Sequence, residues 1–126
     1  MTKGPENTFR DNKLRKLLDS IPCYYTIKEA ASLRGLPDII GVTKGGRFFA
    51  LEVKKDKAEL SCKRTALQGY ILGKIRQMGG FAEFVYPENL EQTIKALIFS
   101  SFSKDEAVSV WTRLTDNFPE LLPQKE

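Results

Sequence analysis

Two carboxylates and a lysine stand at a spacing that could hold a metal ion beside a phosphodiester bond. Asp38 follows Pro37 and opens an apolar run, Glu52 lies fourteen positions later in a second apolar run, and Lys54 follows. If the two runs are antiparallel strands joined by a short turn, the two carboxylates lie within reach of one ion. Carboxylate oxygens and waters suit Mg²⁺ or Mn²⁺, and such an ion activates water for phosphodiester hydrolysis.

Lys54 completes this arrangement because side chains alternate along a strand with a period of two, which puts Glu52 and Lys54 on one face. There the ammonium could orient the attacking water or stabilise negative charge in the transition state. The spacing alone fits a structural alternative equally well. In that interpretation Asp38 caps a strand beside a proline turn, and Glu52 and Lys54 form a solvated pair.

Histidine is absent from all 126 residues. Ser-His-Asp hydrolysis, HNH-type nuclease chemistry and other imidazole-based acid–base mechanisms are therefore excluded. Cys23 and Cys62 do not have the spacing of a metal site, and we expect them to be reduced thiols in a cytoplasmic protein. No apolar run approaches the roughly 20 residues of a membrane span, so no membrane partner is expected.

The segments around these residues predict an α/β fold. The Thr43–Arg47 turn joins two strands into a hairpin, Gly79-Gly80 ends a long helix, and Ser103 with Glu106 forms a capping box. The predicted helices span residues 6–18, 62–78, 88–99 and about 103–117, the strands span residues 23–27, 38–42, 48–54 and 81–86, and residues 55–60 and 119–126 are a polar loop and a frayed tail. This order indicates one domain over residues 1–126, with a mixed β-sheet flanked by helices.

The string Gly35-Leu36-Pro37-Asp38-Ile39-Ile40, the hairpin into Leu51-Glu52-Val53-Lys54 and the helix that carries Gln68 before Gly79-Gly80 resemble a known family. It is the virus-type replication-repair nuclease (VRR-NUC) domain of the PD-(D/E)xK nuclease superfamily. The resemblance covers about residues 6–86, two-thirds of the chain, and leaves residues 88–117 as a C-terminal helical extension. It implies a restriction-endonuclease-like core and a single nuclease domain.

The same resemblance implies roles for individual residues. The metal ligands would be Glu6, Asp38, Glu52 and the backbone carbonyl of Val53, and the catalytic residues would be Asp38, Glu52, Lys54 and Gln68. Two of these have an alternative interpretation. Glu6 also fits an acidic residue favoured in the first turn of a helix by the helix dipole, and Gln68 fits an ordinary helix-surface residue.

Positive charge is concentrated in the first part of the chain. Residues 1–80 contain 16 Lys and Arg against 8 Asp and Glu, whereas residues 81–126 contain 4 against 8. Such polarity favours a polyanionic partner such as DNA. The basic residues near the proposed site in sequence are candidate phosphate contacts, although solvated surface charge is the alternative: Arg34, Lys44, Arg47, Lys55, Lys57, Lys63 and Arg64.

Two aromatic residues and one helix have open roles. Tyr24 and Tyr25 could stack on an exposed base, or they could be core residues of a strand. The last predicted helix carries an apolar stripe of Ala107, Val110, Trp111 and Leu114. The stripe could form a dimer surface, or it could cover the protein's own core.

The expected function is that of an Mg²⁺- or Mn²⁺-dependent DNA endonuclease that prefers branched DNA. Small stand-alone members of the VRR-NUC family from phages are similar to Holliday-junction resolvases and act as homodimers, which implies a homodimer in a bacterial or phage-infected cell. Symmetric cutting of a four-way junction also requires two sites related by a twofold axis. The alternatives are a restriction, homing or repair endonuclease with another DNA preference, and a non-catalytic DNA-binding subunit.

Overall fold

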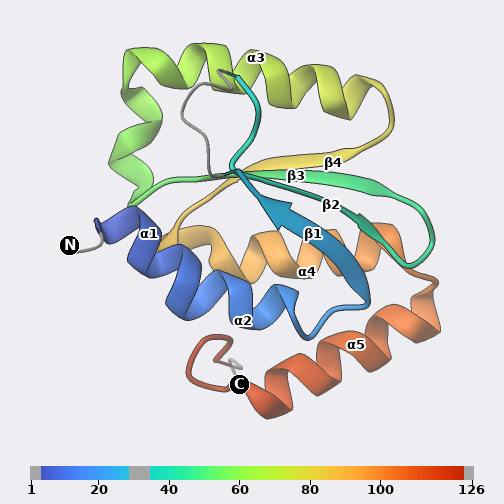
Figure 1. The fold of residues 1–126 in the computed structure, drawn as a ribbon. Coiled ribbons are helices and arrows are strands. Elements are labelled where there is room, and N and C mark those ends of the chain that lie inside the picture. The colour runs from blue at the N-terminus through green and yellow to red at the C-terminus, as the bar shows by residue number, and fades with distance from the viewer. Residues whose placement is uncertain (1–3, 29–34, 124–126) are drawn as a thin grey trace.

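A four-stranded mixed sheet forms the centre of the computed structural model, which describes residues 4–28 and 35–123 (Figure 1). The strands follow the order β1 (Cys23–Ile27), β2 (Ile39–Thr43), β3 (Phe48–Val53) and β4 (Phe81–Val85). The first three strands are antiparallel and β4 is parallel to β3. Helices cover both faces of the sheet, as Figure 1 shows, which confirms the predicted α/β fold with a mixed sheet flanked by helices.

The first predicted helix is one continuous run with a wider turn in its middle. It comprises α1 (Pro5–Phe9), the π-helical turn η1 (Arg10–Leu14) and α2 (Arg15–Leu18). Phe9 and Leu14 are five residues apart, a spacing that a regular α-helix would place on different faces. The π turn bonds residues five apart, so both side chains are buried against the sheet together with Leu17 and Leu18.

One face of the sheet is covered by α3 (Lys63–Gln77), which packs on β3 and β4. Leu72 of this helix is buried between Ala50 of β3 and Ala82 of β4, whose small side chains let the helix approach closely. The segment before the helix was predicted to be a loop, but residues Lys57–Ser61 form the 3-10 helix η2. The Asp56 side chain accepts a hydrogen bond from the Glu59 backbone N–H and so caps η2.

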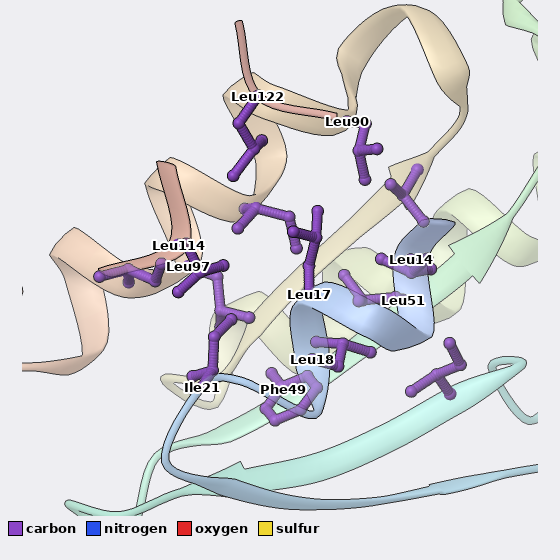
Figure 2. Packing of buried hydrophobic residues seen from close by; sticks show 14 of the residues in the cluster. Leu14, Leu17, Leu18, Ile21, Phe49, Leu51, Leu90, Leu97, Leu114 and Leu122 are labelled. Carbon is purple, nitrogen blue, oxygen red and sulfur yellow. The ribbon is translucent and has the colours of Figure 1, made fainter. Parts of the chain in front are cut away.

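The other face holds the main core, where the first helix packs with α4 (Leu90–Ser101) and α5 (Lys104–Asn117). The 3-10 turn η3 (Pro87–Asn89) leads from β4 into α4. Figure 2 shows leucines from these helices meeting Phe49 and Leu51 of β3. Ser103 accepts a hydrogen bond from the Glu106 backbone N–H, which confirms the predicted cap of the last helix. None of the helices in the described ranges is long and apolar enough to cross a membrane.

The C-terminal segment belongs to this core, which decides between the two alternatives for the apolar stripe and corrects the expectation of a frayed tail. Ala107, Val110 and Leu114 are buried within the chain, so the predicted apolar stripe is not available as a dimer surface. Trp111 is half-buried at the rim of the core, with the Lys95 ammonium 5.6 Å from its ring centre. The predicted frayed tail is also wrong for residues 119–123, because Leu122 is fully buried. Cys23 and Cys62 are free thiols, as expected.

Candidate active site

The β2–β3 pairing brings Asp38 and Glu52 together at one end of the hairpin. Ile39 pairs with Leu51, so Asp38, one residue before β2, lies opposite Glu52. The backbone fixes Asp38 twice: its carbonyl accepts a hydrogen bond of 2.7 Å from the Lys28 backbone N–H, and its Oδ2 accepts one of 2.8 Å from the Val53 backbone N–H. The carboxylate of Asp38 therefore points at the end of β3.

Alternation along β3 decides which face the site occupies. Phe49, Leu51 and Val53 enter the main core, whereas Ala50 packs beneath α3. Glu52 has the same parity as Ala50, so its side chain lies on the α3 face of the sheet. Lys54 follows two residues later and contacts the same α3 side chain as Glu52, which confirms the predicted shared face.

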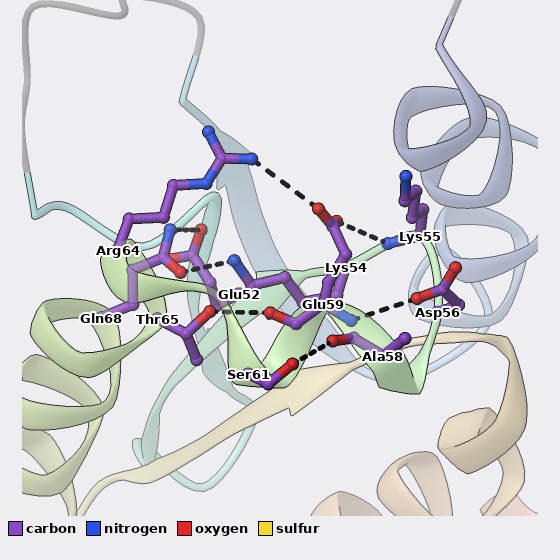
Figure 3. Close-up of polar contacts among 10 residues, drawn as sticks. All are labelled: Glu52, Lys54, Lys55, Asp56, Ala58, Glu59, Ser61, Arg64, Thr65 and Gln68. Atoms are coloured by element: carbon purple, nitrogen blue, oxygen red, sulfur yellow. Dashed lines mark hydrogen bonds and ion pairs between the residues drawn. The ribbon is translucent and has the colours of Figure 1, made fainter.

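That shared contact is Gln68, which projects from the first half of α3 (Figure 3). Its Oε1 accepts a hydrogen bond of 2.6 Å from Lys54 Nζ, and its Nε2 donates one of 3.1 Å to Glu52 Oε1. The amide thus meets the ammonium with its acceptor and the carboxylate with its donor. Gln68 is therefore not an ordinary helix-surface residue, because it joins the two charged side chains and fixes their separation.

Burial distinguishes Glu52 and Lys54 from surface charges. Their relative exposures are 4% and 2%, so the alternative of a solvated pair is wrong. Burial raises the pKa of the Glu52 carboxyl to about 8, and a side-chain hydrogen bond with Asp38 and the negative charge of Asp38 add to the shift. The Lys54 ammonium also lies 5.9 Å from the centre of the Phe84 ring. Burying such groups is costly, and a buried charged cluster with a perturbed pKa is a candidate functional site.

Glu6 reaches the same region from the first helix. Its pKa is raised, first by burial and then by the negative charges of Asp38 and Glu59, while the positive charge of Lys54 acts in the opposite direction. A side-chain hydrogen bond with Glu59 also contributes to the rise. Glu6 therefore lies within the electrostatic reach of the site, although its side-chain hydrogen bond is with Glu59.

Glu59 is a site neighbour that the sequence analysis missed. A hydrogen bond from the Lys55 backbone N–H is the main cause that lowers the pKa of its carboxyl, and the positive charge of Lys54 contributes. Figure 3 shows Glu59 between Lys55 and Arg64, whose Nη2 lies 3.8 Å from Glu59 Oε2. The signal was present in the sequence, because Asp56 and Glu59 have the three-residue spacing of a capping box.

The donor set at this site suits a hard divalent cation that retains several waters. Asp38 and Glu52 supply oxygen ligands only, and Mg²⁺ is commonly held by one or two carboxylates. No group of three His, Cys, Asp or Glu side chains that could hold a metal ion occurs within residues 4–28 and 35–123. The buried Glu52 carboxyl is hydrogen-bonded to the half-buried Asp38 carboxylate, and a cation beside them would offset the repulsion of the two charges. The residues therefore fit a magnesium-type ion with a largely aqueous shell.

The predicted phosphate-binding residues divide between the two ends of the hairpin. Lys55, Lys57, Lys63 and Arg64 are exposed on η2 and the start of α3, close to Lys54 and Gln68. Lys44 and Arg47 instead lie at the turn, at the opposite end of β2 and β3 from Asp38 and Glu52. These two side chains are therefore near the site in sequence but not in space, because the strands of the hairpin separate its turn from its open end. Arg34 lies outside the described residues.

Comparison with known proteins finds no matching family model, no matching curated protein and no matching solved structure. The features of the chain that point to a function are therefore the chemistry and burial of Asp38, Glu52, Lys54 and Gln68.

Proposed function

We propose that this protein is an Mg²⁺- or Mn²⁺-dependent DNA endonuclease with a restriction-endonuclease-like core. The observation that carries the proposal is the buried chain of contacts in which Lys54 and Glu52 meet through Gln68, while Glu52 is hydrogen-bonded to Asp38. If Lys54 and Glu52 formed only a structural ion pair, they could contact each other directly, without Gln68 between them. A hydrolytic site needs carboxylate ligands beside a positioned cation, and these four side chains supply them.

Each side chain has a specific task in this mechanism. Asp38 and Glu52 would hold the ion, and the Val53 carbonyl could add a backbone ligand. Glu6, whose side chain is hydrogen-bonded to Glu59, forms no three-carboxylate group with them among residues 4–28 and 35–123, so it would act on the ion through its charge. When bound, the ion supplies Lewis acidity at the phosphate and lowers the pKa of a coordinated water. Lys54 Nζ stabilises the negative charge that develops on the phosphate oxygens, and Gln68 keeps the ammonium from turning toward Glu52. Burial strengthens both effects, because the charges act in a region of low dielectric.

The exposed cations beside the site favour DNA as the polyanion. Lys55, Lys57, Lys63 and Arg64 lie on one segment that leads away from Lys54, where they can contact phosphates on both sides of the cut. Branched DNA is the proposed substrate, and a homodimer is the proposed form that cuts it symmetrically. Since the α5 stripe is buried, the dimer contact would use another surface.

A panel of end-labelled DNA substrates tests the proposal. The wild-type protein, with Mg²⁺ or Mn²⁺, is mixed with a four-way junction, a flap and a linear duplex, and the products are resolved on a denaturing gel. We expect cleavage of the junction or flap above the duplex, no cleavage in EDTA, and none with Ca²⁺, whose looser shell positions water poorly. Preferential cutting of the duplex would instead favour a restriction or homing endonuclease.

Asp38→Asn is the matched variant, because it keeps the size of the side chain and removes a metal ligand. It should bind the same substrates without cutting them. Cleavage by the variant at the wild-type rate, or cleavage in excess EDTA, would overturn the mechanism. Binding without cleavage by the wild type in either metal would favour a non-catalytic DNA-binding subunit. Sedimentation at micromolar concentration tests the homodimer, and a monomer would exclude it.

A further inference from the structure

An open groove of about 930 Å³ runs beside β1 and reaches the proposed active site at one end. Its floor is formed by β1 together with Lys28 and Asp38, and its opposite wall comes from the first helix. The helix contributes the side chains of Asn7, Arg10 and Arg15. Asp38 lines the groove and also lies opposite Glu52, so the groove ends beside the proposed active site.

The groove follows the outer edge of the sheet. Among the strands that the structure describes, β1 pairs with β2 alone, and the groove is lined by β1 over its whole length. Tyr24 lies near one end of β1, and Lys28, whose backbone N–H bonds to the Asp38 carbonyl, lies just beyond the other. At the rise of a strand, these four steps cover on the order of 13 Å. That length matches about four nucleotides of a stacked DNA strand.

Tyr24 and its neighbour Tyr25 have opposite roles, although the sequence left both open. Tyr25 packs against the main core and its hydroxyl donates a hydrogen bond to Asp19. Tyr24 points to the other side of the strand and is 75% exposed. A large aromatic ring so exposed contributes little to the fold, while a rigid strand holds it in a fixed position. Tyr24 is therefore a preformed surface for stacking.

The charges in the groove favour a phosphate backbone. Arg10, Arg15 and Lys28 line the groove. Arg10 donates two hydrogen bonds to Asp11, at 2.9 and 3.3 Å, so the positive charge that faces a ligand comes mainly from Arg15 and Lys28. Of the two acidic residues there, Asp19 is bonded to the Tyr25 hydroxyl and Asp38 belongs to the proposed metal site. Arg15 lies 3.7 Å from Asp11 and remains 46% exposed, so its guanidinium can also meet a phosphate.

We propose that this groove binds an unpaired DNA strand along the edge of the sheet and leads it to Asp38. One base stacks on Tyr24 at one side of β1, and Arg15 lies beside the phosphates on the side of the first helix. A strand in a duplex cannot make the same contact, because both faces of each base are already stacked on neighbours. The substrate is thus a branched or tailed duplex with an unpaired segment of about four nucleotides beside the cut. This inference rests on the proposed function.

Fluorescence anisotropy of the full-length protein in EDTA tests binding apart from cleavage. The probes are one labelled blunt duplex and the same duplex with single-stranded tails of increasing length. Wild-type affinity should rise with tail length and level off at about four nucleotides. Tyr24→Ala should weaken binding of the longest tail about tenfold and leave the blunt duplex unchanged, since one stacked base is lost. Tyr24→Trp should retain the wild-type affinity.

Tyr70→Ala is the matched control. Tyr70 is 62% exposed on α3, where its ring lies near Lys74, so the variant also removes an exposed tyrosine but outside the groove. It should bind every probe as the wild type does. A fluorescent 2-aminopurine placed along the tail adds a local readout, and quenching at one position should disappear in Tyr24→Ala alone.

The outcomes separate this inference from the proposed function. If the wild type cuts branched DNA but Tyr24→Ala binds tails as tightly as Tyr70→Ala, the groove assignment is overturned and the nuclease remains. If tail binding depends on Tyr24 but the protein cuts no DNA in Mg²⁺ or Mn²⁺, the groove is supported and the nuclease is not. If tails add nothing to wild-type affinity, the groove does not bind an unpaired strand.

Discussion

The two ends of the β2–β3 hairpin hold their charged side chains in opposite ways. At the open end, Glu52 and Lys54 are buried and meet each other through Gln68. At the turn, Arg47 donates hydrogen bonds to the carbonyls of Gly79 and Ser100, at 3.3 and 2.7 Å. Nearby, Lys44 forms an exposed ion pair with Glu106 at 3.1 Å.

This difference concerns what each set of charges does for the fold. The turn-end cations bind carbonyls and a carboxylate from distant segments, so they attach the hairpin to the helices behind it. The open-end charges are withdrawn from water at an energetic cost, and both bind one uncharged side chain, Gln68 of α3. Charges buried at such a cost agree with the proposed chemistry, whereas exposed cations that tie distant segments together are explained by structure.

The largest expected effect is on the rate of DNA cleavage, and it separates a cation at the open end of the hairpin from one at the turn. Lys54→Met should lower the rate of DNA cleavage by about 10²–10³, because transition-state stabilisation is lost. Its free energy of unfolding should also fall, by about 3–5 kcal/mol, because removing one partner leaves Glu52 and the Gln68 Oε1 acceptor buried without the ammonium. Cleavage is therefore measured at a temperature where the variant is folded. Single-turnover cleavage and urea unfolding measure the two quantities.

Arg47→Ala is the companion variant at the turn. It should lose about 1 kcal/mol of stability with its two hydrogen bonds and keep its cleavage rate at a temperature where it is folded. A fully active Lys54→Met, or an inactive Arg47→Ala with wild-type stability, would reverse the assignment of the two ends.

The sequence predicted the open end well because its geometry is local. The turn at 43–47 fixes the register of two adjacent strands, which is sufficient to bring Asp38 opposite Glu52. Period-two alternation then puts Glu52 and Lys54 on one face. Gln68 reaches the site through a long-range contact between α3 and β3, which the periodicity of the sequence does not reveal. Its assignment to the site came from the family resemblance alone.

The errors arose where tertiary contacts decide. Lys44 and Arg47 are close to Glu52 in sequence, but the strand between them converts that closeness into distance. The α5 stripe could equally have faced a partner, and only the packing of α4 and α5 on the sheet shows that it covers the protein's own core. Leu122 was assigned to a frayed tail because one buried leucine among polar residues leaves no periodic pattern.

The next effect concerns the pH dependence of stability in the metal-free protein. The folded-state pKa of Glu52, about 8, lies above its ordinary value of 4.5, chiefly because of burial. The contribution of Glu52 to the free energy of unfolding is therefore fully present below pH 4.5 and is lost as the pH rises toward 8. The slope can reach about 1.4 kcal/mol per pH unit for one proton.

Urea unfolding in EDTA across this pH range measures the slope, with a matched glutamine variant at each end of the hairpin. Glu52→Gln should flatten the curve, because an amide does not titrate. Glu106→Gln, which removes the exposed partner of Lys44, should leave the slope unchanged. A wild-type stability that rises between pH 4.5 and 8 would contradict the buried state of Glu52.

The smallest effect expected is on DNA affinity, and it compares exposed cations at the two ends. Lys57→Glu with Arg64→Glu reverses two charges beside the site, and Lys44→Glu with Lys104→Glu reverses two charges near the turn. Each lost phosphate contact reduces the dependence of log affinity on log salt by about 0.9 for duplex DNA, so the first pair should lower the slope by about 2.

The second pair has the same change in net charge, and a general electrostatic attraction would make the slopes of the two double variants equal. Anisotropy titrations over a salt series distinguish these cases, because only phosphate contacts at the open end give a lower slope for the first pair alone. Equal slopes would mean that the positive charge of residues 1–80 acts through the whole surface, and that the open end of the hairpin is not where DNA lies.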